Sequence, residues 1–339
     1  MKKIISLCIV VLMTTAAFAQ QQLATLLHND SITVFYGVNA LRSAHAAAVN
    51  GDAITLSEGT FNSVNITKAV TIRGAGMFVD TTARTMPTIL QGEFHIDVPQ
   101  DSTYWLTLEG LYHYQYILYK TAYNPLFMKC KFKKFQADIN TTGMSNARFI
   151  NCIIEEWHNC TNNSVWRATG TQFINCAILS TTDESPDRLV NCVAYVYPYN
   201  ATSKTIINSV VYYNGGTTGN GSNNSYSSFN SIGIHIKGNN YYDLSVVSGN
   251  NLWNYTTFNQ VFKTFNGTYS DGINFELKDD IAASRLGTDG TQVGIYGGQC
   301  PFDPSVRNPL IGHATVGRTT TSDGKLEVEV QVFSESDNQ

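Results

Sequence analysis

The sequence carries little charge, and apart from its start it has no long apolar stretch. Lys, Arg, Asp and Glu make up 14% of the 339 residues, below the roughly 25% of average domains. No basic patch stands out, so a nucleic-acid partner is not expected. No segment after the first nineteen residues is apolar enough to cross a membrane. Asn, Ser, Thr, Tyr and Gly are abundant instead, a composition common in secreted β-proteins.

The first nineteen residues predict a secretory signal peptide. They read MKKIISLCIVVLMTTAAFA, with two lysines, an apolar stretch from Ile4 to Met13 and an Ala-Phe-Ala cleavage signal. That stretch is too short for a spanning helix. We therefore expect a mature chain that begins at Gln20 and is secreted, periplasmic or at the cell surface.

A repeat of about 20 residues runs through the middle of the chain, most visibly in RFINCIIEEW and QFINCAILST. Each copy has an apolar residue, then a polar one, then a small one. The nine small residues are Gly74, Gly92, Gly110, Cys130, Cys152, Cys176, Cys192, Ser209 and Ser231. In the last five copies the polar residue is asparagine: Asn151, Asn175, Asn191, Asn208 and Asn230. The period and the lack of helical periodicity predict a solenoid of short parallel strands.

The restriction to small residues has a physical reason. Coils of such a solenoid are about 4.8 Å apart, so each side chain stacks on its own copy and only a small one fits at a tight corner. The asparagines are expected to form a ladder of amides that hydrogen-bond from coil to coil. The sequence thus predicts an all-β fold, a single-stranded right-handed parallel β-helix of about ten coils.

Both ends of the solenoid need a cover. Residues 38–49 have the alanine-rich face of a short capping helix. Residues 311–334 alternate apolar and polar side chains after the turn SDGK, which predicts a small β-hairpin. The expected organisation is a signal peptide (1–19), an N-terminal segment (20–37), the capped β-helix (38–298) and a C-terminal extension (299–339).

Two stretches carry a family resemblance. NGDAITLSEGTFNSVNITKAVTIRGAG resembles the opening of right-handed parallel β-helix proteins of the pectate-lyase-like (pectin lyase-like) superfamily, and FELKDDIAASRLGTDGTQVGIYGG is similar to their closing segment. Chains of this kind with short C-terminal extensions are frequent among secreted Bacteroidetes proteins. The resemblance spans about 38–298 and implies the fold, but this architecture carries lyases, hydrolases, esterases and non-catalytic surface proteins.

The sequence lacks the catalytic sets of that superfamily: N-T-D, G-H-G and R-I-K are absent. Asp279 and Asp280 are expected in a solvated loop. The EEWH segment, Glu155–His158, is the best catalytic candidate, yet neighbours on a strand point to opposite faces. His235 and Lys237 are a weaker candidate for a lyase-like base. We expect no catalytic residue, no metal and no cofactor.

The cysteines favour a structural role. Four of the six that follow the predicted signal peptide occupy the small position of the repeat, where buried thiols are typical. Paired C-x-x-C spacing, which a zinc site would favour, is absent. The states of Cys160 and Cys300 are left open.

Aromatic side chains suggest a ligand. Phe135, Trp157 and Tyr197 stand five residues after the small position of their coils, and Tyr213 stands four after it. A column of such rings would form a stacking platform for a sugar chain. Trp166 and Arg167, in the longest loop, are expected to flank it. The sequence favours non-catalytic polysaccharide binding; a polysaccharide lyase or glycoside hydrolase with an atypical site and an adhesin or structural surface protein are the alternatives.

Overall fold

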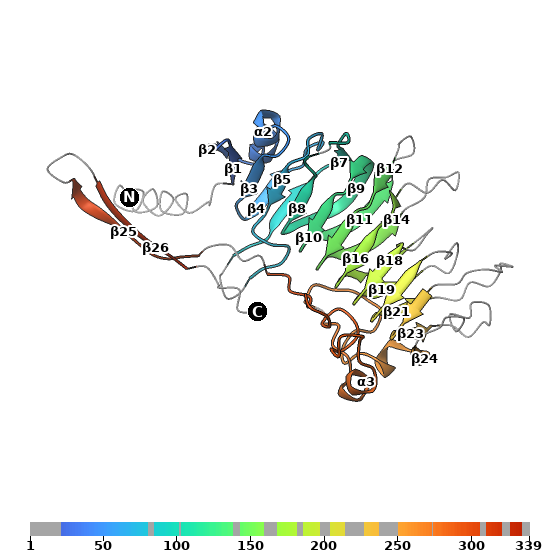
Figure 1. Cartoon of the computed structure of the whole chain (residues 1–339). Coiled ribbons are helices and arrows are strands. Elements are labelled where there is room, and N and C mark those ends of the chain that lie inside the picture. Colours follow the sequence, from blue (N-terminus) through green and yellow to red (C-terminus); the bar gives the residue numbers. More distant parts are fainter. Residues whose placement is uncertain are drawn as a thin grey trace, which may run out of the picture.

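The protein is a parallel β-solenoid (Figure 1). The computed structural model describes residues 22–80, 85–101, 103–137, 143–158, 168–181, 186–196, 204–213, 227–236, 250–272, 274–305, 310–320 and 326–333. The predicted signal peptide lies outside these residues.

Sheet A forms one side of the solenoid and has eleven strands in the order β2-β1-β3-β5-β8-β10-β13-β16-β18-β20-β22. From β3 onward every neighbouring pair is parallel. The strands are β1 Leu23–His28, β2 Ser31–Tyr36, β3 Ala53–Leu56, β5 Thr71–Arg73, β8 Thr107–Glu109, β10 Leu126–Met128, β13 Arg148–Ile150, β16 Gln172–Ile174, β18 Arg188–Val190, β20 Thr205–Ile207 and β22 Ser227–Phe229.

Sheet B has thirteen strands and forms the rest of each coil. They are β4 Gly59–Asn62, β6 Thr88–Gln91, β7 Phe94–Asp97, β9 Leu111–Tyr123, β11 Lys131–Ala137, β12 Gly143–Ser145, β14 Ile153–His158, β15 Ala168–Thr169, β17 Ala177–Ile178, β19 Val193–Tyr195, β21 Val210–Tyr213, β23 Ile232–His235 and β24 Leu252–Tyr255. The coil count is somewhat lower than the predicted ten. One reason is Gly92, which follows a strand of sheet B and therefore does not begin a coil.

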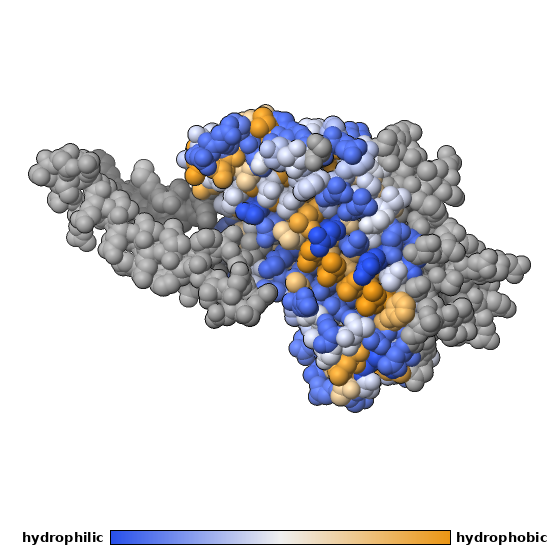
Figure 2. All heavy atoms as spheres, in the orientation of Figure 1, coloured by the Kyte–Doolittle hydropathy of each residue, from blue (hydrophilic) through white to orange (hydrophobic). Residues whose placement is uncertain are grey.

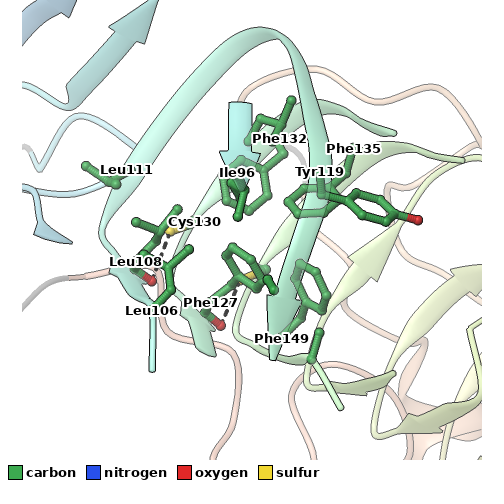
Figure 3. Close-up of a cluster of buried hydrophobic side chains, with 14 of the residues drawn as sticks. Ile96, Leu106, Leu108, Leu111, Tyr119, Phe127, Cys130, Phe132, Phe135 and Phe149 are labelled. Carbon is green, nitrogen blue, oxygen red and sulfur yellow. Dashed lines mark hydrogen bonds between the residues drawn. The ribbon is translucent and has the colours of Figure 1, made fainter. Parts of the chain in front are cut away.

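Aromatic rings stack through the interior. Phe149 lies between Phe127 and Phe173 in successive coils, with ring centroids 4.5 and 4.4 Å away. Tyr119 and Phe135 form a second stack against the first from sheet B (Figure 3). The coil spacing brings equivalent rings into face-to-face contact, so each coil is held by its neighbours.

The cysteines and serines of the repeat line the interior at one corner. Cys152 Sγ donates to the Ile150 and Phe127 carbonyl oxygens, 3.4 Å away in each case, and Ser209 Oγ donates to Ile207 O in the same manner. The column is also linked along the axis, since the Cys192 N–H donates to Ser209 Oγ at 3.0 Å. Burial raises the pKa of the Cys192 thiol to about 12, so this thiol is neutral at ordinary pH.

The corner itself is made by the residue before that column. Asn151, Asn175, Asn191, Asn208 and Asn230 all have φ between 46° and 53°, in the left-handed region that asparagine tolerates better than most residues.

The register differs from the predicted repeat at the glycines. Gly110 follows Glu109, which pairs with Met128, so Gly110 corresponds to Lys129, the residue before Cys130. Gly74 follows Arg73, the partner of Glu109, and shifts in the same way. Both glycines therefore occupy the corner position rather than the interior one. At Gly110 φ is 64°, in the left-handed region that glycine adopts readily. The predicted small-residue column thus holds for the cysteines and serines alone.

The apolar residues two places before the small column lie on the outer face of sheet A, because their inner neighbours such as Phe149 fill the core. Figure 2 shows a hydrophobic band along this face. Its residues are Met128, Ile150, Ile174, Val190, Ile207 and Phe229.

The N-terminal cap follows the prediction. Helix α2, Ala40–Ala47, covers the first coil, and β1 and β2 form an antiparallel hairpin that extends sheet A. The Lys68 ammonium group donates to the carbonyl oxygens of His45, Ala46 and Ala48 at 2.8, 2.9 and 2.6 Å. It thus satisfies carbonyls that the helix end leaves open.

The other end of the chain folds back along the outside. We call residues 256–305 the return segment; it contains the 3₁₀ turn Phe258–Gln260 and helix α3, Asp279–Ser284. Its apolar side chains pack on the outer face of sheet B and form a second core. That core includes Ile153, Ala177, Val193, Val210, Ile232, Phe262, Phe265, Phe275 and Val293.

The predicted C-terminal hairpin is present. Strands β25, Leu310–Thr320, and β26, Leu326–Phe333, pair antiparallel and form a separate two-stranded sheet.

Candidate functional site

The predicted aromatic platform is not on the surface. Trp157 is 0% exposed and lies inside the solenoid against Phe135 and Phe173, with centroid distances of 5.7 and 5.2 Å. Strands β11 and β14 bend partway along, and the register of β11 on β9 shifts between Phe132 and Lys134. At the bend of each strand, two successive side chains face outward. Beyond the bend, each side chain therefore lies on the opposite face from the one that strict alternation predicts. The ring column therefore belongs to the core.

Tyr197, Trp166 and Arg167 lie outside the described residues, as do Cys160 and Lys237, and the side chains of Tyr213 and His235 are not described. Cys300 is a free, exposed thiol.

The EEWH carboxylates are engaged in separate ion pairs. Glu155 contacts Lys133, with a short hydrogen bond, and Lys131 at 3.7 Å. Glu156 lies 3.4 Å from His158 Nε2 and 3.8 Å from the Lys134 ammonium group. The same bend leaves both glutamates partly exposed on the outer side, so the expectation of opposite faces was wrong here. The hydrogen bond to Glu155 raises the pKa of Lys133. Lysine side chains thus balance the charge of both carboxylates.

Asp279 and Asp280 begin helix α3, where carboxylates favour the positive helix end. Asp279 also pairs with Lys263 at 2.8 Å. Their place in a helix, rather than a loop, corrects the sequence expectation, and both side chains are exposed to solvent as expected.

The predicted asparagine ladder takes another form. No hydrogen bond joins two of the five amides among the described residues. Asn175 Nδ2 instead donates to Ile295 O and Gly297 O, at 2.9 and 2.6 Å, and Asn208 exchanges hydrogen bonds with Thr288. Two of the five amides, those of Asn175 and Asn208, therefore bind the return segment. A direct coil-to-coil amide contact occurs at a different corner, where Asn146 Nδ2 donates to Asn124 Oδ1 at 3.2 Å.

A groove crosses the outer bend of sheet B, and we call it the side groove. It consists of two adjoining hollows of about 550 Å³ each, which share Gly92 and Glu93. The first is also lined by Gln115, Tyr116, Lys133, Lys134 and Glu156, and the second by Arg42, Asn62, Ser63, Val64, Asn65 and Gln91.

Polar and aromatic groups converge in the side groove. Tyr116 is 44% exposed, and Tyr114 beside it is also exposed. Gln91 Nε2 donates to Asn62 Oδ1 at 2.9 Å, which fixes one amide against the next. The lining comes from strands β4, β6, β9, β11 and β14, which pair in that order. Four spacings of about 4.8 Å give the groove a length of roughly 19 Å.

Sequence reasoning missed this groove, although one signal was present. Strand β9 reads LYHYQYILYKTAY, with tyrosines at every second position from Tyr112 to Tyr116. Strict alternation would place all three on one face. The structure exposes Tyr114, Gln115 and Tyr116 together, because β9 bends there.

Beside the groove, a buried lysine joins sheet B to the return segment. Lys131 is 2% exposed, and its ammonium group lies 4.5 Å from the Tyr112 ring centroid and 5.0 Å from that of Tyr269. It also forms a short ion pair with Asp271. Rings and carboxylates thus replace the water that this charge loses.

Within the described residues, no cluster of His, Cys, Asp and Glu could hold a metal ion, and no helix has the length and apolar character needed to span a membrane. No family model matches the chain, and no curated protein and no solved structure matches it significantly. The structure therefore supports the predicted family resemblance only in its fold, which is a parallel β-solenoid.

Proposed function

We propose that this chain is a secreted or surface-exposed β-helix protein that binds a polysaccharide along the side groove without cleaving it. In keeping with the sequence resemblance, we place it with the pectate-lyase-like proteins of the secreted Bacteroidetes type. The observation that carries the proposal is the exposed Tyr116 ring in a long groove lined by amides and ion-paired charges.

The chemistry of the groove fits a sugar chain. Ring faces of sugars pack on aromatic side chains, and their hydroxyl groups exchange hydrogen bonds with amides and charged groups. Lys133 and Lys134 are each paired with a glutamate, so the groove has no unbalanced charge at that end. A neutral or weakly charged glycan therefore fits better than a densely charged one.

The test is affinity electrophoresis across a panel of neutral and acidic polysaccharides. Tyr116→Ala should weaken retention by about tenfold, in line with the loss of one stacking ring. Tyr104→Ala is the matched control, because Tyr104 is 46% exposed but lies outside the groove. Equal retention of both variants and the unaltered protein would exclude the side groove as the binding site.

The alternatives separate in the same samples. Release of unsaturated products or of reducing ends would indicate a polysaccharide lyase or a glycoside hydrolase. No retention on any glycan, together with a protein partner recovered by pull-down, would indicate an adhesin or structural protein.

A further inference from the structure

Strand β2 forms the N-terminal edge of sheet A. All six of its residues pair with β1 on one side, and no described strand pairs with it on the other. Its sequence, SITVFY, contains no charge, proline or glycine. Exposed edges normally carry such residues, or a bulge, because an unprotected edge pairs with other strands.

The side chains on this edge are apolar and exposed. Ile32 is 70% exposed, Tyr36 62% and Val34 41%. They alternate along the strand, so all three stand on the same face of the sheet. In β1, Leu27 pairs with Ile32, Leu23 with Tyr36 and Thr25 with Val34. The two leucines widen the apolar surface on that face. Pairing with another strand stabilises such an edge most when that strand places apolar side chains opposite those of β2.

We propose that β2 is a dimerisation edge and that its occupant is β2 of a second copy of this chain, paired antiparallel about a two-fold axis at Val34. A two-fold axis perpendicular to the sheet leaves each side chain on its own face. Residues that pair across the axis must therefore be an even number of positions apart in the sequence, because side chains alternate between the two faces. Centred on Val34, this register sets Ile32 opposite Tyr36 of the partner subunit and Val34 opposite Val34 of the partner subunit.

The strand is self-complementary in this register. Every exposed apolar side chain meets another one, and the absence of charge in β2 removes like-charge repulsion between copies. The contact joins the two eleven-stranded sheets into one continuous sheet, with the solenoids pointing away from each other. A two-fold contact also closes on itself, so it ends the exposed edge without building a filament.

Sedimentation velocity over a range of concentrations tests the proposal. We expect the unaltered chain to dimerise in the micromolar range, and Val34→Lys, which sets two ammonium groups opposite each other, to weaken dimerisation at least tenfold. Val79→Lys is the control, since Val79 is similarly exposed but lies away from β2. A monomer at every concentration, or a dimer that Val34→Lys leaves unchanged, would overturn the proposal.

The register has its own test. Ile32→Glu alone should weaken the dimer, and adding Tyr36→Lys to the same chain should restore it, because each glutamate would then face a lysine of the partner subunit. Within one chain these positions are about 13 Å apart and cannot pair directly. Failure of the second change to restore the dimer would rule out a two-fold axis at Val34.

Discussion

At the residue scale, each corner of the solenoid requires different properties of two neighbouring residues. The first must accept a left-handed backbone, which Asn151 and Asn175 do at φ of 53° and 50°. The second must be small and hydrogen-bond the carbonyl two residues before it, as Cys152 and Ser209 do. The Asn-Cys pair therefore reflects backbone geometry and packing rather than thiol chemistry.

A substitution at Cys152 tests this reading. Cys152→Ser should fold and cost about 1 kcal/mol, because a hydroxyl can make the hydrogen bond that Ser209 already makes. Cys152→Phe should cost more than about 3 kcal/mol or prevent folding, since the stacked coils leave no room. Urea unfolding followed by circular dichroism measures both. Loss of glycan retention in a stably folded Cys152→Ser variant would show that the thiol has a functional role.

At the element scale, the return segment is the part that sequence patterns described least well. It runs back past several coils, since Gly294 N–H donates to Asn208 O at 2.7 Å and Lys129 Nζ donates to Ser305 O at 2.6 Å. The repeat contained a signal for it: the residue after the small one is apolar in successive coils, as in Ile153 and Val210. These side chains point outward and would face water without the return segment.

Two glycines of the return segment provide a matched test. Gly298 and Gly272 have similar positive φ values, 81° and 85°. A Cβ at Gly298 would lie 1.9 Å from Asn191 Nδ2, whereas a Cβ at Gly272 meets nothing within 4 Å. Gly272→Ala should therefore cost about 1 kcal/mol for backbone strain alone, and Gly298→Ala roughly 2–4 kcal/mol. Equal losses in urea unfolding would mean that the return segment does not pack against this corner.

At the scale of the whole molecule, two cores share sheet B. The first fills the coils, and the second lies between the outer face of sheet B and the return segment. In a solenoid each coil contacts only its neighbours. The return segment adds contacts between residues more than a hundred positions apart, including the ion pair of Lys131 and Asp271, and it thereby ties several coils into one unit.

Replacing Lys131 tests this connection. Lys131→Met keeps the volume of the side chain but removes its charge, and it should cost about 1–2 kcal/mol through lost contacts with the Tyr112 and Tyr269 rings. Hydrogen exchange should rise in residues 256–305 and stay unchanged in the first coils. Lys133→Met is the control, because Lys133 is half exposed and its ion pair with Glu155 contributes less to the free energy of unfolding. Faster exchange throughout the chain would argue against a local connection.

The sequence by itself determined the solenoid, its N-terminal cap and its C-terminal hairpin. Local rules suffice there: stacking restricts the interior position after each corner to small residues, and alternation identifies the hairpin strands. Only the tertiary structure decided which aromatic rings are buried. The bend after Phe132 reverses the faces of the strand, so Trp157 enters the core and Tyr116 lines the groove. The return segment likewise depends on contacts between residues distant in sequence, and no repeat along the chain encodes their partners.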